Sequence, residues 1–124
     1  MNILLTLDGI LSSESGEPIR TGVQLYYALN EANRVVIITN RNKDDADHWL
    51  KSHGIIGYDD LVGSEVHLEG EELRKRQIIL CRSRAPLGLY VDSDPTICAW
   101  VFEQQQVPIL LLANPRSEEH TSEL

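Results

Sequence analysis

The sequence predicts an α/β domain in three layers, with a doubly wound, mostly parallel sheet of about five strands and helices on both faces. First, short apolar runs alternate along the chain with amphipathic stretches of helical spacing. Second, the run RVVIIT at 34–39 is β-branched and apolar at both odd and even positions, as expected of a parallel strand buried on two faces. Third, the connections are short, so right-handed crossovers place the helices on the two faces of one sheet.

Five apolar runs are the predicted strands. They are short, and turn-forming residues such as Asp, Gly and Pro bound several of them. A polar stretch at 11–20 follows the first strand and is predicted as a loop or small flap. In chain order, the predicted strands are 3–7, 34–39, 60–66, 87–91 and 107–112.

Four helices are predicted between the strands, and three of them begin at recognisable capping residues. Thr21 and Gln24 have capping-box spacing, which starts the first helix. Asn42 caps the second helix, and Asp94 caps the fourth, with Pro95 at its first position. The predicted helices are 21–32, 43–53, 69–82 and one that begins at 95. The residues of this last helix expected to face inward are Ile97, Cys98, Val101 and Phe102.

Charge and composition exclude several classes of protein. The 124 residues include 11 Lys+Arg and 19 Asp+Glu, and the resulting net charge of −8 repels phosphate backbones and anionic lipid. We therefore expect neither nucleic acid nor a membrane as partner. No apolar run suffices for a membrane span, and the first residues lack the pattern of a signal peptide. We expect Cys81 and Cys98 to be reduced core thiols of a cytoplasmic domain, and no feature favours a particular oligomeric state.

The last nine residues differ from the rest of the chain. The string RSEEHTSEL has no apolar periodicity, and its composition is that of a solvated tail. It is also similar to the translation of a common sequencing-library adapter. We therefore expect a single domain over 1–115 and a non-native or disordered tail over 116–124.

Polar residues stand where the predicted strands end. In doubly wound sheets, ligands bind outside the carboxyl ends of the strands, near the point where the strand order reverses. The side chains expected at that edge are Thr6, Asp8, Thr39, Asn40, Asp92 and Asp94.

Four segments resemble the motifs of the haloacid dehalogenase-like (HAD) superfamily. They are ILLTLDGIL at the first strand, VVIITN at the second, the basic cluster Arg74-Lys75-Arg76, and LYVDSDP near the end. The resemblance covers 3–113 and is closest to small members without a large cap domain, including phosphatase-like proteins of phage genomes. It implies a Mg²⁺-dependent phosphohydrolase in which a first-motif Asp is the nucleophile. A second Asp, two residues later, then acts as general acid and base.

The resemblance also implies roles for individual residues, with a small phosphorylated molecule as ligand. The implied phosphate-binding residues are Thr39, Asn40 and Lys75, with Arg74 or Arg76 as substitutes for Lys75. The implied Mg²⁺ ligands, all hard oxygen donors, are Asp8, Asp92 and Asp94.

The first motif departs from the family pattern, which is Asp-x-Asp-Gly. Asp8-Gly9 matches its second half, and this alignment places Thr6 where the nucleophilic carboxylate belongs. A hydroxyl is a weak nucleophile without an activating base, and one Mg²⁺ ligand is missing, so we expect Mg²⁺ affinity to be weak or lost. In the alternative alignment Asp8 is the nucleophile and Ile10 replaces the acid. Residue 8 lies about 6.6 Å along the strand from residue 6, which disfavours that alignment.

Two functions therefore compete. Thr6 favours a domain that has lost phosphohydrolase activity and retains a phosphate- or Mg²⁺-type site or a protein-binding role. The alternative is an active Mg²⁺-dependent phosphatase of a small phosphorylated substrate that works through Asp8. Plain structural roles also remain open: Thr6 as a β-branched strand residue, Asp8 as a turn former, and Asp94 as a helix cap.

Overall fold

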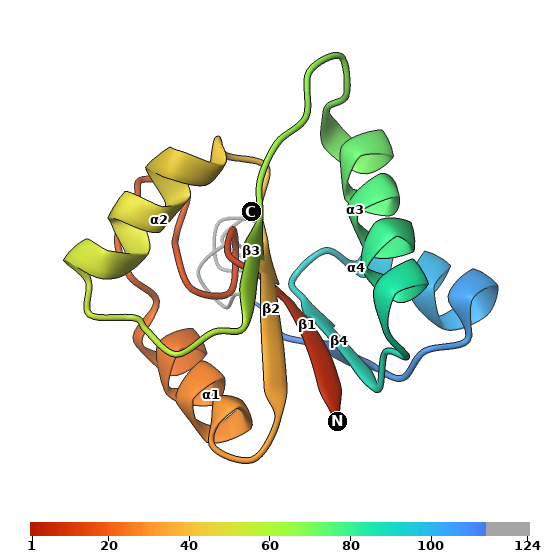
Figure 1. Cartoon of the computed structure of the whole chain (residues 1–124), viewed down its shortest axis with the longest axis horizontal. Coiled ribbons are helices and arrows are strands. Elements are labelled where there is room, and N and C mark those ends of the chain that lie inside the picture. Colours follow the sequence, from red (N-terminus) through yellow and green to blue (C-terminus); the bar gives the residue numbers. More distant parts are fainter. Residues whose placement is uncertain (114–124) are drawn as a thin grey trace, which may run out of the picture.

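The computed structural model describes residues 1–113, in which a five-stranded parallel sheet lies between two layers of helices (Figure 1). The strand order is β3-β2-β1-β4-β5, and each neighbouring pair is parallel. The strands are β1 (Asn2–Thr6), β2 (Arg34–Ile38), β3 (Asp60–Val62), β4 (Leu89–Asp92) and β5 (Ile109–Leu111). The predicted fold class, a doubly wound α/β domain, is confirmed. The tail predicted over 116–124 and the domain limit at 115 lie outside the described residues.

Helices cover both faces of the sheet. Figure 1 shows α1 and α2 on one side of the strands and α3 and α4 on the other. The helices are α1 (Arg20–Asn30), α2 (Lys43–Ser52), α3 (Gly70–Arg84) and α4 (Pro95–Trp100), and a π-helical turn, η1 (Val101–Gln105), continues α4. In the described part of the chain, no helix is both long and apolar enough to cross a membrane.

Alternation along β1 divides the core into two halves. Ile3 and Leu5 belong to the cluster that includes residues of α1 and α2. Leu4 belongs to the cluster that includes Ile78 of α3 and Ile97 of α4. Thr6 has the same parity as Leu4 and therefore faces the α3 and α4 side of the sheet. This orientation decides which residues the Thr6 hydroxyl can meet.

Two of the three predicted caps are confirmed. The side chain of Asn42 accepts hydrogen bonds from the backbone at the start of α2, and Asp94 does the same for α4 with Pro95 in its first turn. The capping box at Thr21 is wrong, because α1 begins one residue earlier and its N-cap, Ile19, makes no side-chain bond. The backbone N–H of Ile19 instead donates to the Leu11 carbonyl at 2.8 Å, so packing against the 11–20 segment sets the start of this helix.

The end of the last helix also differs from its prediction. Ile97, Cys98 and Val101 are buried as expected, but Phe102 is 61% exposed. The helix changes to the wider π form at Val101, so the residues after it no longer follow the α-helical spacing that placed Phe102 inside. Both cysteines are free thiols, with Cys98 buried and Cys81 half-buried.

Candidate functional site

The ends of β1, β2 and β4 meet at the carboxyl edge of the sheet, and the turn that follows β1 is tightly built. Gly9 has φ +89°, and a Cβ at this position would lie 2.1 Å from the Ser93 hydroxyl oxygen. Only glycine fits both the left-handed conformation and this close approach. The turn after β1 can therefore lie close to Ser93 in the turn after β4, and the pairing of β1 with β4 places the polar residues of both strand ends near one another.

Thr6 and Asp92 form a buried pair at this edge. The Thr6 side chain is fully buried, and its hydroxyl donates to Asp92 Oδ1 at 3.1 Å. Asp92 also accepts bonds from the Tyr90 hydroxyl, from the Ser93 N–H at 2.7 Å and from the Asp94 N–H at 3.2 Å. Burial, together with the Asp92 charge, raises the pKa of Tyr90, which keeps it protonated as a donor. The Asp92 carboxylate is therefore engaged by four donors of the chain itself.

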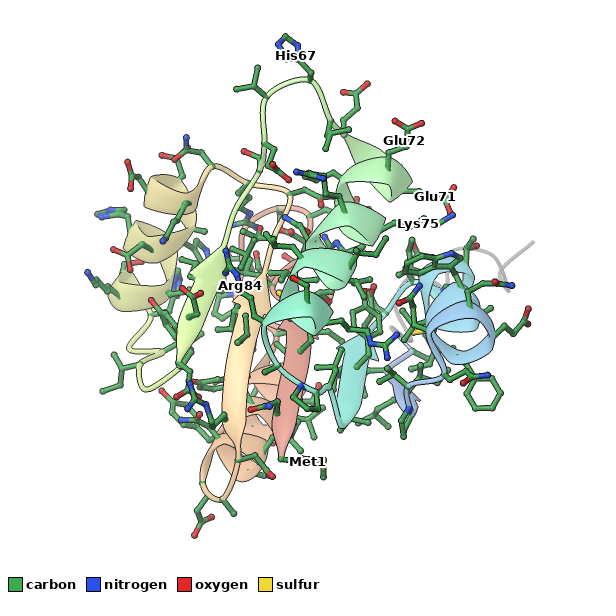
Figure 2. All side chains as sticks on the ribbon, turned by 45° about the vertical axis from the view of Figure 1, so that its right-hand side comes forward. Met1, His67, Glu71, Glu72, Lys75 and Arg84 are labelled. Carbon is green, nitrogen blue, oxygen red and sulfur yellow. The ribbon has the colours of Figure 1, made fainter. Side chains whose placement is uncertain are left out.

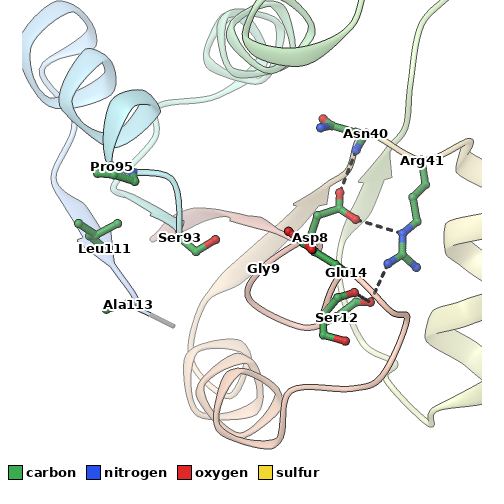
Figure 3. Close-up of a pocket in the computed structure, with 11 residues that line it drawn as sticks. Asp8, Gly9, Ser12, Glu14, Asn40, Arg41, Ser93, Pro95, Leu111 and Ala113 are labelled. Carbon is green, nitrogen blue, oxygen red and sulfur yellow. Dashed lines mark hydrogen bonds and ion pairs between the residues drawn. The ribbon is translucent and has the colours of Figure 1, made fainter. Parts of the chain in front are cut away.

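Asp8 lies just past the end of β1 and is the point on which several donors converge (Figure 3). Its Oδ2 accepts from the Thr39 hydroxyl at 2.8 Å and from the Asn40 N–H at 3.0 Å. Its Oδ1 accepts from Arg41 Nε at 3.1 Å. The Asp8 side chain is 31% exposed, so it is held firmly but remains open to a ligand.

Arg74 reaches the same edge from α3. Its side chain is 7% exposed, and its terminal nitrogen lies 2.7 Å from Asn40 Oδ1 and 3.9 Å from Asp8 Oδ2. The Arg74 Nε is buried and has no hydrogen-bond partner in the structure. A buried guanidinium without a short ion pair is costly, so this residue is a strong candidate for contact with an anion.

Arg41 is a site residue that the sequence analysis missed. Besides its bond to Asp8, it donates to the Ser12 hydroxyl at 2.6 Å, and its guanidinium lies 5.5 Å from the centre of the Trp49 ring. Trp49 in turn donates to the Gly16 carbonyl at 2.8 Å. Arg41 therefore links the strand end to α2 and to the 11–20 segment. Its position directly after Thr39-Asn40, at the end of a strand, was the available signal.

Lys75 does not join the site. Its Nζ lies 5.3 Å from the centre of the Trp100 ring, and Figure 2 shows Lys75 on α3 on the side toward the last helix. Arg76 is also directed elsewhere, because it pairs with Glu65 at 3.1 Å. Of the three basic residues proposed for this role, the structure therefore brings Arg74 to the carboxyl edge of the sheet, beside Asp8 and Asn40.

Two hollows open at this edge and share Asp8, Asn40 and Ser93. The larger has a volume of about 600 Å³, with residues of the 11–20 segment on one wall and of β5 on another (Figure 3). The smaller has a volume of about 290 Å³ and is lined by Arg74 among others. Thr6 lines neither hollow. The position that resembles a nucleophile is thus closed to both.

The three carboxylates implied as Mg²⁺ ligands border the smaller hollow, but each already accepts hydrogen bonds from protein donors. Asp8 and Asp92 accept the bonds described above, and Asp94 Oδ1 accepts from the Thr96 N–H at 2.9 Å. Among residues 1–113 no three His, Cys, Asp or Glu side chains are grouped closely enough to hold a metal ion. The donor set fits Mg²⁺ poorly, because Thr6 supplies an uncharged hydroxyl where the Asp-x-Asp-Gly pattern has a carboxylate, and the carboxylates that remain already accept hydrogen bonds from the protein.

Comparison with known proteins gives the fold. No protein-family model and no curated protein matches the chain. Chains from two structures of a Pnkp1/Rnl/Hen1 complex, one described as an RNA repair complex, superpose with TM-scores of 0.72 and 0.77. Their sequences are 11% and 12% identical to this one over 90% of it, and this chain spans 42% and 45% of their lengths. At that identity the likeness shows an α/β fold with a Rossmann-like sheet.

Proposed function

We propose that this HAD-like domain binds a small phosphate-bearing ligand at the carboxyl edge of its sheet and does not hydrolyse it. The burial of Thr6 carries this proposal. Its hydroxyl donates to Asp92 and faces neither hollow, so it is not available to attack a phosphoryl group. Without a nucleophile, the site can bind the ligand but cannot form a covalent phosphoryl intermediate.

The two arginines support an anionic ligand. Arg41 and Arg74 bring two positive charges to one carboxylate, that of Asp8. Arg74 adds a buried Nε that lacks an acceptor. Guanidinium groups bind phosphate through paired hydrogen bonds, and low exposure strengthens that attraction. Arg74 lines the smaller hollow, so a phosphate oxygen bound there would lie beside its guanidinium group.

We further propose that Mg²⁺ affinity is lost rather than merely weakened. Both oxygens of Asp8 and of Asp92 accept hydrogen bonds from protein donors, and an ion would have to displace several of them. Thr6 offers no charge to offset that cost. When bound in such sites, Mg²⁺ would neutralise phosphoryl oxygens; here Arg41 and Arg74 supply that positive charge.

A second candidate, an active Mg²⁺-dependent phosphatase, has one observation in its favour. Asp8 is partly exposed where the two hollows join, so a substrate could reach its carboxylate. Mg²⁺-dependent turnover of an aryl phosphate that disappears in Asp8→Ala would support this candidate and overturn the first.

The negative net charge of the chain decides which partners we propose. The structural neighbours come from an RNA repair complex, but their likeness concerns the fold, and a net charge of −8 disfavours a polynucleotide. We propose a cytoplasmic small-molecule binder with neither nucleic acid nor membrane as partner; the free thiols Cys81 and Cys98 are consistent with a reducing compartment.

The test is a calorimetric titration of the purified chain with phenyl phosphate. Arg74→Gln should weaken binding about tenfold or more, because it removes a charged hydrogen-bond donor. Arg76→Gln is the matched control: it makes the same change on the same helix at an exposed residue paired with Glu65. Equal affinity of the two variants, or no binding by the unmodified chain, would contradict a phosphate site at Arg74.

A further inference from the structure

We infer that the Asp8 carboxylate is the resident occupant of the anion site, so that an incoming oxyanion binds by displacing it. This inference rests on the proposed function, and it identifies the groups that hold the ligand. It also gives Asp8 an autoinhibitory role: Asp8 weakens ligand binding, whereas a catalytic acid would promote the reaction.

The hydrogen-bond donors at this edge all point to the same carboxylate. The Thr39 hydroxyl and the Asn40 N–H donate to Asp8 Oδ2 at 2.8 and 3.0 Å, and Arg41 Nε donates to Oδ1 at 3.1 Å. Arg74 lies 3.9 Å from Oδ2. A hydroxyl, a backbone amide and two guanidinium groups form a complete set for a tetrahedral oxyanion.

The local charges are not balanced by Asp8 alone. Two guanidinium groups surround its single negative charge, and their remaining bonds go to the neutral oxygens of Ser12 and Asn40. Asp92 is nearby, but four donors of its own already solvate its charge. A doubly charged anion would therefore satisfy Arg41 and Arg74 better than one carboxylate does.

Other acidic residues near the site oppose the binding of a doubly charged anion. Glu71 and Asp94 border the smaller hollow, and Glu14 borders the larger one. All three are exposed, so water and salt screen their repulsion of a bound anion more than they screen the attraction of buried Arg74. Glu71→Gln should accordingly strengthen phosphate binding, most clearly at low ionic strength.

Asp8 also has room to leave its position. It lies in the turn between Thr6 and Gly9 rather than within β1, and it borders both hollows. A rotation of its side chain toward the larger hollow, of about 600 Å³, would vacate the donors without moving the sheet.

The experiment compares inorganic phosphate binding by the unmodified chain, Asp8→Asn and Asp8→Ala, by titration calorimetry at fixed ionic strength. Asp8→Asn keeps the shape and removes the charge, whereas Asp8→Ala also empties the position. Both should bind phosphate more tightly than the unmodified chain, by about tenfold or more, because one negative charge within a few ångströms of the site has gone. Glu31→Ala removes one charge at the opposite edge of the sheet and should leave phosphate affinity unchanged.

The outcomes separate this inference from the proposed function. Phosphate binding by the unmodified chain that becomes tighter in both Asp8 variants supports the inference. Equal or weaker binding by folded Asp8 variants, with phosphate bound by the unmodified chain, overturns the inference and leaves the proposed function standing. Absence of binding by all of them overturns both. Thermal unfolding of each variant shows that it is folded under the assay conditions.

Discussion

Replacement of Thr6 by aspartate gives residues 6–9 the Asp-x-Asp-Gly pattern that they resemble, and it tests how Thr6 and Asp92 are placed. In the structure the Thr6 hydroxyl donates to Asp92 Oδ1 at 3.1 Å, in a fully buried position. A carboxylate at residue 6 loses that hydrogen bond and places a second negative charge beside the Asp92 carboxylate. We predict that Thr6→Asp is strongly destabilised in the absence of divalent metal and that Mg²⁺ reverses part of this loss.

The magnitude follows from the geometry. Two like charges about 4 Å apart repel by about 4 kcal/mol at an effective dielectric constant of about 20, and the lost bond to a charged acceptor adds about 1.5 kcal/mol or more. Relaxation of the two side chains and partial protonation reduce this sum. We therefore expect a loss of about 3 kcal/mol in the free energy of unfolding at pH 7, which corresponds to a Tm lower by about 10 °C for a domain of this size.

The assay is thermal unfolding followed by circular dichroism, with chelator and then with millimolar Mg²⁺. Thr6→Asn is the matched control, because it has the shape of aspartate without its charge. Mg²⁺ should raise the Tm of Thr6→Asp by several degrees and leave Thr6→Asn and the unmodified chain unchanged, since only the first has two facing carboxylates for the ion. Equal stability of Thr6→Asp and Thr6→Asn in chelator would refute the placement of Thr6 against Asp92. Equal stabilisation of the unmodified chain by Mg²⁺ would refute the loss of the metal site.

Three further predictions test the fold around the site. Gly22→Ala should cost about 3 kcal/mol or more, because its Cβ would lie 1.6 Å from the Ile10 carbonyl oxygen; Thr21→Ala, next to it, should change stability by less than about 0.5 kcal/mol because Thr21 caps nothing. Equal urea midpoints for these two variants would contradict the close packing. Asn42→Ala should lower the free energy of unfolding by about 1 kcal/mol through loss of the α2 cap, and an unchanged urea midpoint would contradict it. Burial, followed by the charge of Asp92, raises the pKa of Cys98 to about 12, so iodoacetamide at pH 8 should modify this thiol slowly until the chain unfolds; rapid modification of the native chain, detected by mass spectrometry, would contradict its burial.

The residues that local rules govern were predicted well from the sequence. β1 was placed within one residue at each end, and the caps Asn42 and Asp94 were correct because each acts on the backbone two or three residues away. The capping box at Thr21 failed because two tertiary contacts fix the start of α1: the hydrogen bond from the Ile19 N–H to the Leu11 carbonyl and the close approach of Gly22 to Ile10. Sequence spacing carries no information on such a tertiary contact.

The choice among the three basic residues of α3 shows where periodicity could have gone further. Arg74, Gln77 and Ile78 are buried, and they share one face of the helix at spacings of three and four residues. That spacing places Arg74 toward the sheet and Lys75 away from it. Arg41 was harder to foresee, because its role depends on how the 11–20 segment and Trp49 lie around the strand end.

Equilibrium dialysis against phenyl phosphate, with and without Mg²⁺, distinguishes a site that only binds phosphate from one that hydrolyses it. The amounts of bound ligand and of free phosphate are both measured after prolonged incubation. We expect about one intact phenyl phosphate bound per chain and no release of inorganic phosphate above the protein-free blank. Mg²⁺-dependent release of phosphate would show that the site is catalytic after all, and a dialysis chamber with no excess ligand would show that the arginines do not form an anion site.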